Sequence, residues 1–433
     1  MALGTGGWTL QNMVLPGTYI NFTSPLLATA SAGETGVVAI PLELDWGKEG
    51  EVFAIEYSEA ISGLKAILGY DILSDQMKYI RELFKNAQKL WVYRLGTSTK
   101  ASCTYASALH GGVRGNDIKL VIAKNDNVFT VETYLDGVLV DSQDVFSAAD
   151  LADNDYLSFI KTSTLAVTTG LSLTGGANDS AIDGTDYQDF LDKIESYTYN
   201  ILACPSTVDT VKSLFVAFTK TMCDDSGSNF QTVCYKAENA DHQCVVTVEN
   251  ESLDSTCPQG LIYWTAGALA NCSVGESLTN KTYDGELDID VDYTQAELKA
   301  GINAGKFMFH SVNGIAVVLK DINSFISFTD TKGQDFASNQ TVRITMSLAT
   351  DIAAQFGNYY LGKVQNDSAG RLSLWNDVCK ILSSYQSLRA IEDFSSQDIT
   401  ISEGDDRKSV VCEISNLQLV GAMETLYMNV VII

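Results

Sequence analysis

The segment TGVVAIPLEL, residues 35–44, and the segment LWVYRL, residues 90–95, are two short and mostly apolar runs. Apolar runs of this length that contain β-branched and aromatic residues predict buried β-strands. Between them, residues 57–68 and 75–90 place apolar side chains at helical spacing. A strand, helices and a second strand in this order predict an α/β layer.

The α/β pattern stops near Thr97 and resumes after residue 172. Between these points, residues 118–122 are strand-like, and two further apolar runs flank Asp136-Gly137, a pair that readily takes the positive φ angles of a type I′ hairpin turn. Beyond the insert we predict helices at 187–194, 208–222 and 260–270, and strands at 199–203, 230–235 and 244–248. The sequence therefore predicts one α/β core domain, residues 31–97 and 173–290, interrupted by a β-rich inserted domain, residues 98–172.

A third unit is predicted over residues 294–433, an α+β domain. Its predicted helices are 294–304, 341–356 and 371–390, and its predicted strands are 307–310, 314–319, 399–402 and 410–414. In the last helix an apolar stripe is predicted to be buried, with Lys380 on the opposite side and Arg389 near the helix end. The predicted fold class is thus a multidomain α+β and α/β protein with extended terminal strands.

Both chain ends have the pattern of strands that need a partner. The last residues, LYMNVVII at 426–433, contain no charge and no proline, and an apolar strand left bare is an aggregation hazard. The N-terminal arm, residues 1–30, carries an alternating apolar and polar run after Pro16-Gly17. We predict that both segments join sheets in neighbouring molecules. The predicted inter-subunit residues are Tyr19, Ile20, Asn21, Phe22, Leu426, Tyr427, Met428, Val430 and Val431.

The charge balance excludes several classes of function. The chain of 433 residues has 28 Lys and Arg against 54 Asp and Glu, a net charge of -26. Nucleic-acid binding needs a basic surface, and an anionic membrane surface also attracts basic segments. The acidic charge therefore predicts no nucleic-acid partner. The sequence also predicts no direct membrane insertion, because no apolar run reaches the ~18 residues that a spanning helix requires. The nine cysteines form no C-x-x-C pair and are interpreted as reduced thiols of a protein folded in a cytosol.

Signals of catalysis or metal binding are weak. His242 lies two residues before Cys244, which admits a Cys–His nucleophile, but a histidine of a surface loop is the favoured interpretation. Gly305-Lys306 lacks the spacing of a phosphate loop and is read as a glycine that ends a helix. Residues 288–292, DIDVD, lack the glycine and glutamate of a calcium loop and are interpreted as a half-solvated strand. We predict no enzyme, no cofactor and no catalytic or metal-binding residue.

Short motifs in a fixed order resemble those of the tail sheath proteins of contractile phages, in the form found in phages, defective prophages and phage-tail-like bacteriocins of Gram-positive hosts. They cover nearly the whole chain. The matching motifs are Pro16-Gly17-Thr18-Tyr19, Leu173-Thr174-Gly175-Gly176, Asp183-Gly184, Ala266-Gly267-Ala268, Ser277-Leu278-Thr279, Ala304-Gly305-Lys306, Asp321-Ile322-Asn323, residues 362–367 (GKVQND) and residues 422–428 (AMETLYM).

The resemblance implies a structural subunit that polymerises around an inner tail tube and contracts to drive the tube through a target cell envelope. It implies further contacts with baseplate and tail terminator or collar proteins, and terminal strands that join a sheet of the neighbouring C-terminal domain. It places the C-terminal unit beside the tube, with Lys380 and Arg389 as the expected contact. Assembly is expected in the bacterial host cytoplasm, as part of a phage tail or a released tail-like particle.

Two other function classes remain as alternatives at this point. An α/β hydrolase-like enzyme with a β-rich binding insert would need a cleft where acidic, histidine or nucleophilic side chains converge, and the sequence shows no such set. A passive filament or surface-layer protein would need an export signal, which the first residues do not show.

Overall fold

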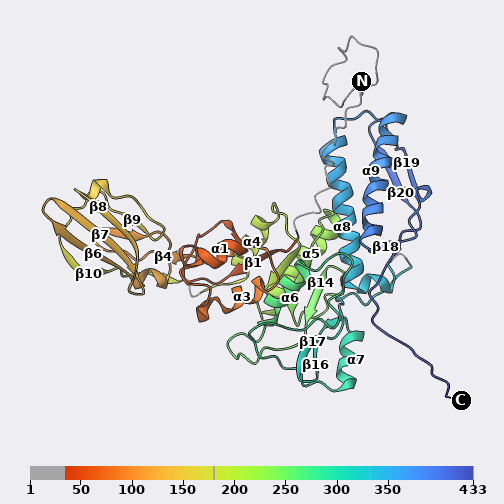
Figure 1. Cartoon of the computed structure of the whole chain (residues 1–433), viewed down its shortest axis with the longest axis horizontal. Coiled ribbons are helices and arrows are strands. Elements are labelled where there is room, and N and C mark those ends of the chain that lie inside the picture. The colour runs from red at the N-terminus through yellow and green to blue at the C-terminus, as the bar shows by residue number, and fades with distance from the viewer. Residues whose placement is uncertain (1–34, 179–180, 331, 433) are drawn as a thin grey trace, which may run out of the picture.

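The computed structural model describes residues 35–178, 181–330 and 332–432, and the predicted arm residues Tyr19, Ile20, Asn21 and Phe22 lie outside this part. Figure 1 shows an elongated molecule, with a β-rich body at one end, a central sheet, and two long helices side by side at the other end. The helices are α1 (Tyr57–Ser62), α2 (Leu64–Leu68), α3 (Lys78–Phe84), α4 (Gly184–Ile194), α5 (Asp209–Lys220), α6 (Leu261–Ala270), α7 (Gln295–Asn303), α8 (Asn339–Gln355) and α9 (Ser368–Ser387).

The centre of the molecule is a seven-stranded sheet with the order β15-β14-β13-β12-β1-β3-β2. All neighbouring strands are parallel except β2, which pairs antiparallel to β3. The strands of this sheet are β1 (Val37–Leu42), β2 (Val52–Glu56), β3 (Lys89–Arg94), β12 (Ile201–Cys204), β13 (Gln231–Tyr235), β14 (Val245–Val248) and β15 (Lys306–Phe307). Strands from before and after the β-rich insert therefore lie in one sheet.

Two apolar clusters cover the two faces of the central sheet. One contains α3 and α6, and the other contains α4 and α5. Every residue of α6 is buried, as expected for a helix that is apolar all round. A Cβ atom at Gly267 of α6 would lie 2.5 Å from the carbonyl oxygen of Leu83, so glycine is required where α6 crosses α3.

The β-rich body contains a four-stranded antiparallel sheet with the order β10-β6-β7-β8. Asp136 and Gly137 both have positive φ, 56° and 76°, so the predicted type I′ turn between β7 and β8 is confirmed. The strands of this body are β4 (Ser98–Thr99), β5 (Ala106–Ala108), β6 (Ile118–Asn125), β7 (Val128–Leu135), β8 (Val138–Val145), β9 (Leu157–Phe159), β10 (Thr168–Ser172) and β11 (Ala177–Asn178).

The C-terminal part packs α8 and α9 against each other over a separate apolar cluster. Three small two-stranded sheets lie in this half of the chain: two lie beside α9, and one lies with α7 next to the central sheet. Their strands are β16 (Phe309–Val312), β17 (Ile315–Val318), β18 (Ile391–Glu392), β19 (Ile399–Glu403), β20 (Val410–Ile414) and β21 (Gln418–Leu419). The predicted stripe of α9 is buried, with Leu374, Val378, Ile381, Leu382 and Tyr385 facing α8 and its neighbours.

Several predictions of local structure need correction. β15, predicted in the C-terminal unit, pairs with β14 at the edge of the central sheet. Residues 288–292 form no strand, because only Ile289 bridges to a neighbouring segment. Gly63 divides the predicted helix 57–68 into α1 and α2. Gly305 does end α7 with a φ of 69°, as predicted.

Candidate assembly interface

The predicted C-terminal strand does not form within this single chain. After β21 the described residues up to 432 belong to no helix or strand. Ala422 donates its backbone N–H to the side chain of Gln340 (2.9 Å), and Glu424 accepts a hydrogen bond from Thr279 (2.7 Å). Beyond Glu424, residues 425–432 make no hydrogen bond or ion pair with the rest of the described chain. The segment is anchored at its base and free along its apolar part.

Side chains of this free segment are almost fully exposed. The exposed fractions of its large apolar side chains lie between 66% and 92%. These residues are Leu426, Tyr427, Met428, Val430, Val431 and Ile432. Soluble monomers rarely expose a contiguous apolar patch, and such a patch marks an interaction site. We call residues 426–432 the C-terminal tail.

The same chain contains a small sheet with free edges. β19 and β20 pair antiparallel, with Ile399 opposite Ile414 and Glu403 opposite Val410. Neither strand pairs with a third strand within the described residues. A two-stranded sheet with free edges can accept a further strand, because its outer N–H and C=O groups lack ladder partners.

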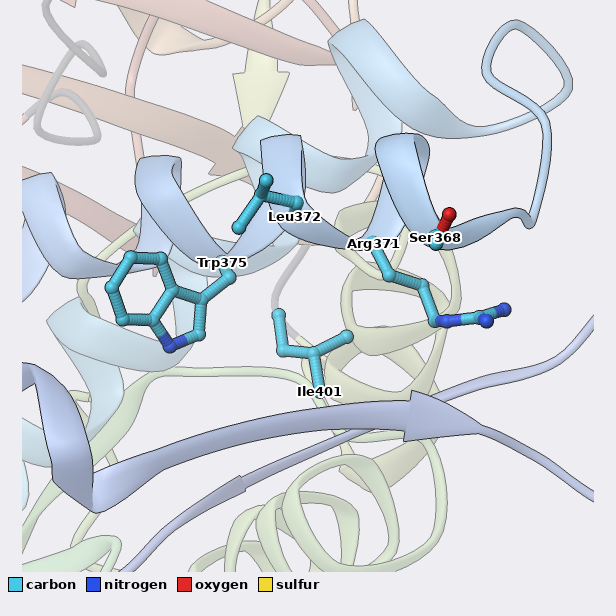
Figure 2. A pocket seen from close by; sticks show the side chains of 5 residues that line it. All are labelled: Ser368, Arg371, Leu372, Trp375 and Ile401. Carbon is cyan, nitrogen blue, oxygen red and sulfur yellow. The ribbon is translucent and has the colours of Figure 1, made fainter.

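A groove of about 360 Å³ lies between α9 and β19. Figure 2 shows the side chains of Leu372 and Trp375 on α9 opposite Ile401 on β19, with Arg371 at one end. Trp375 donates from its ring Nε1 to the carbonyl of Ile399 (3.1 Å), which fixes the indole against the strand. Leu372 is 59% exposed, so the apolar lining of the groove is open to a partner. We call Leu372, Trp375 and Ile401 the groove residues.

The groove residues were not predicted from the sequence. Leu372 and Trp375 are three residues apart on a face of α9 that differs from its buried stripe. That second apolar face was the available signal, but a single exposed leucine or tryptophan is common on helices. Only the folding of β19 alongside α9 makes the two residues one wall of a groove.

Lys380 and Arg389 both line a second and larger cleft, between α9 and the central sheet. Lys380 is exposed and its Nζ lies 2.9 Å from a carboxylate oxygen of Asp377. Arg389 follows the end of α9 in the left-handed conformation, with a φ of 57°. The structure therefore places the two cations on the wall of one cleft, and their contact with a tube stays a prediction.

The Cys–His pair considered from the sequence has the wrong environment for a nucleophile. His242 is 7% exposed, so its predicted place in a surface loop is wrong, and burial lowers the pKa of its imidazole. A hydrogen bond with Cys223 and burial together raise the pKa of the Cys244 thiol well above its ordinary value. A nucleophilic cysteine instead needs a lowered pKa. In the described part of the chain no three His, Cys, Asp or Glu residues are grouped as metal ligands.

No helix among residues 35–432 that the structure describes is both long and apolar enough to cross a bilayer.

Four protein-family profiles match successive parts of the chain. They are the phage tail sheath protein beta-sandwich domain at residues 95–178, the central domain at 180–324, and the C-terminal domain at 331–433. The fourth, the tail sheath protein Gp18 domain III N-terminal region, matches residues 35–95. These profiles begin the C-terminal domain at residue 331, whereas the sequence analysis placed its start at 294.

Two proteins of Bacillus subtilis (strain 168) are similar over their whole length. The protein YqbK is 31% identical over 96% of both chains, and the phage-like element PBSX protein XkdK is 29% identical over the same shares. A tail sheath protein of Clostridium phage phiCD119 is 24% identical over 41% of this chain and 51% of its own length.

Solved structures give the same result. The sheath tail protein of Desulfitobacterium hafniense is 35% identical, with a TM-score of 0.82 over 96% of this chain and 99% of that one. The sheath tail protein Lin1278 of Listeria innocua is 27% identical, with a TM-score of 0.78 over 92% and 94%. None of these matches supports the hydrolase alternative. The chain belongs to the phage tail sheath protein family, and the predicted role as a subunit of a contractile tail sheath is confirmed.

Proposed function

We propose that copies of this chain polymerise by strand donation, in which the C-terminal tail of one copy adds to the β19–β20 sheet of another. One observation carries the proposal. The described chain has an exposed apolar tail that pairs with no strand, and a two-stranded sheet that lacks a third strand and lies beside an apolar groove. Backbone hydrogen bonds would hold the tail to the sheet edge, and the groove residues would receive its alternate side chains.

Donation between copies fits the position of the tail better than donation within one copy. Figure 1 shows the tail leaving the body in a direction away from β19 and β20. Its base is held by the contact of Ala422 with Gln340 at the start of α8 and by the contact of Glu424 with Thr279 of the central domain. A donor and an acceptor at different places on one surface make a head-to-tail contact, which gives an open helical filament unless the rotation closes a ring.

Within the described residues, the β19–β20 sheet has no third strand at either edge, and the chain has two predicted donor strands. We propose that the arm residues Tyr19–Phe22 of a further copy occupy the second edge. Each acceptor sheet would then join strands from three copies. Thr425, between the anchored Glu424 and the tail, would let the bodies rotate while the donated strands stay paired, which suits a switch between two packings.

We propose that the polymer surrounds an inner tail tube and is attached to baseplate and collar proteins. A structural neighbour supports the assembly: the helical sheath of the anti-feeding prophage in its contracted state shares the fold, with a TM-score of 0.57 and 13% identity. Lys380 and Arg389 on the α9 cleft are the proposed tube contact, because cations in so acidic a chain can attract an acidic partner.

A mixing experiment tests strand donation directly. A variant that ends at Thr425 keeps the acceptor and lacks the donor, and Leu372→Asp keeps the donor while placing a charge in the groove. We expect neither variant to form sheaths alone, as seen by negative-stain microscopy. Mixed together they should form small complexes, because each complex pairs one intact tail with one intact groove. Leu253→Asp, another exposed leucine far from the groove, is the matched control and should assemble normally.

Normal sheaths from the variant that ends at Thr425 would contradict the proposal. So would mixtures that behave as two separate monomers in analytical ultracentrifugation.

A further inference from the structure

Two cysteines that are distant in the sequence lie side by side where α5 ends. The helix continues into a single π-helical turn, η4 (Thr221–Asp225), which contains Cys223. Cys244 directly precedes β14, and the two thiols are hydrogen-bonded to each other. π-Helical turns are rare and are frequent at functional sites, so this pair of thiols is a candidate for chemistry.

Further contacts hold the two cysteine-bearing segments together. The Sγ atom of Cys223 lies 3.5 Å from the carbonyl oxygen of Phe230, the residue before β13. His242 accepts at its Nδ1 from the backbone N–H of Cys244 (3.2 Å). Its Nε2 therefore carries the proton and donates to a carboxylate oxygen of Asp224 (3.1 Å), which links η4 to the residues before β14. The two sulfur atoms are thus kept close by contacts on both sides of the pair.

The two thiols differ in exposure and in acidity. Cys244 is 1% exposed, whereas Cys223 is partly exposed. The hydrogen bond between them lowers the pKa of the Cys223 thiol, with burial acting in the opposite direction. The same hydrogen bond and burial raise the pKa of the Cys244 thiol. A partly exposed thiol with a lowered pKa beside a second thiol is the arrangement of a redox-sensitive cysteine and its resolving partner.

We propose that Cys223 and Cys244 are a redox-sensitive pair, in which a peroxide oxidises Cys223 and Cys244 then closes a disulfide between them. The Cys223 thiolate attacks one oxygen of hydrogen peroxide, the O–O bond breaks, and a sulfenic acid and hydroxide result. The sulfur of Cys244 then attacks the sulfur of Cys223, the S–O bond breaks, and a second hydroxide leaves. The protons of the two thiols convert the two hydroxides to water, so two thiols and one peroxide give one disulfide and two waters.

The first step prepares the second. Oxidation of Cys223 removes the thiolate that accepts the proton of Cys244, so the main cause of the raised pKa of Cys244 is lost before this thiol has to react.

The disulfide would fasten η4 to the beginning of β14. Asn229, which follows η4, donates from its side chain to the hydroxyl of Thr350 on α8 (2.9 Å), so the fastened segment also contacts the C-terminal helices. The crosslink would therefore stiffen the central domain at its junction with α8. It concerns the single subunit and does not depend on strand donation between copies.

A second pair of neighbouring cysteines provides a comparison within the same chain. Cys204 of β12 and Cys234 of β13 are opposite each other in parallel strands, and both are 0% exposed. A hydrogen bond with Cys204 and burial raise the pKa of the Cys234 thiol. Because a peroxide reaches these thiols only if the sheet opens, we expect this pair to stay reduced.

Peptide mapping of the reduced full-length protein after treatment with hydrogen peroxide tests the proposal. We expect the Cys223–Cys244 disulfide, detected by mass spectrometry without reduction, to form at least about tenfold faster than any Cys204–Cys234 disulfide. Oxidation should also raise the melting temperature by about 5 °C, because the crosslink closes a loop in the unfolded chain. Cys103→Ser, at another partly exposed thiol, is the matched control and should change neither result.

Two variants separate the roles of the pair. Cys244→Ser should accumulate a sulfenic acid on Cys223 that dimedone traps, and Cys223→Ser should leave Cys244 unoxidised. A wild-type chain without this disulfide, after the exposed Cys412 has been oxidised, would overturn the proposal. Equal rates at the two cysteine pairs would also overturn it, because proximity alone would then explain the reaction. Complete crosslinking without any rise in melting temperature would overturn the fastening of η4.

Discussion

The β-rich body and the C-terminal part differ in how far their strands are paired within the chain, although β8 and β10, at the edges of the body's sheet, also have one neighbour each. In the body, β6 and β7 each have a strand on both sides, and the turn between β7 and β8 is tied to the central domain. Arg114 joins the carboxylate of Asp136 in this turn to the carbonyl of Gly69, with an Nε–O distance of 2.8 Å. In the C-terminal part, β19 and β20 have one neighbour each, and the apolar tail has none in the described chain.

Under the proposed strand donation, the C-terminal part gains strands from other copies, whereas the β-rich body does not. Internal pairing satisfies the backbone groups of a strand and hides its apolar face, so the strand adds stability to the monomer. An unpaired strand edge and an exposed tail add little to the stability of the monomer, but each can pair with a strand of another molecule. Under the proposed strand donation, they contribute stability only in the polymer.

Removing the C-terminal tail should have the largest effect, because it should abolish assembly without unfolding the monomer. A chain that ends at Thr425 should stay folded and soluble, with a melting temperature within about 2 °C of the full chain, because the side chains of residues 426–432 are largely exposed and make no hydrogen bond with the described residues. It should form no sheaths in negative-stain images. Deletion of residues 1–22 is predicted to have the same outcome. Contractile tails of normal length from either truncation would remove the distinction between the two regions.

Excising the β-rich insert should leave the central domain folded. Joining Gly96 to Leu173 through a short linker removes the sheet β10-β6-β7-β8 together with its own core. Trp46 of the central domain packs into that core and would become exposed, so Trp46→Gln should accompany the excision. Circular dichroism should show the helix content of the remaining chain retained. If the remaining chain no longer unfolded cooperatively, the central domain would depend on the insert for its fold.

Single substitutions should change the free energy of unfolding much more in the β-rich body than in the C-terminal tail. Leu120 of β6 is fully buried, and Leu120→Ala should lower the free energy of unfolding by about 2–5 kcal/mol. Val431 in the tail is 78% exposed, and Val431→Ala should change it by less than about 0.5 kcal/mol. Urea titration of the monomer measures both values. Comparable losses at the two positions would mean that the tail is packed in the monomer.

Charge reversal at the cleft should affect assembly on tubes more than folding. Lys380→Glu with Arg389→Glu removes the Lys380–Asp377 ion pair, and an exposed pair of this kind contributes about 0–1 kcal/mol. We therefore expect a folded monomer with slower or weaker assembly on purified tubes, followed by light scattering. The double variant Lys299→Glu with Arg407→Glu, at two exposed cations outside the cleft, is the charge-matched control. Unchanged tube-dependent assembly would remove α9 as the tube contact.

Ionic strength should produce the smallest effect. Each copy carries a net charge of -26, so packing copies together raises their repulsion. The screening length is about 8 Å at 0.15 M salt and shrinks as salt is added. Assembly without a tube should therefore become moderately faster with added salt or divalent cations, as measured by sedimentation. A rate independent of salt would show that interface charges are already matched between neighbours.

Local sequence patterns predicted much of the fold but not its edges. The runs at 35–44 and 90–95 become β1 and β3, and the Asp136-Gly137 turn has the expected geometry. The register and neighbours of short strands were harder to predict. The strand β15 has only residues 306–307, and its place depends on pairing with β14, more than fifty residues earlier in the chain. The strand expected at 288–292 failed because alternation alone supplies no pairing partner.

The sequence by itself determined the α/β alternation, the type I′ turn and the uncharged apolar tail, since each depends on residues close together in the chain. Only the tertiary structure decided which of the described strands have a free edge and that Leu372 and Trp375 face Ile401. These features join segments far apart in the sequence. They arise from contacts between segments that fold next to each other, and the local spacing of apolar residues does not specify such contacts.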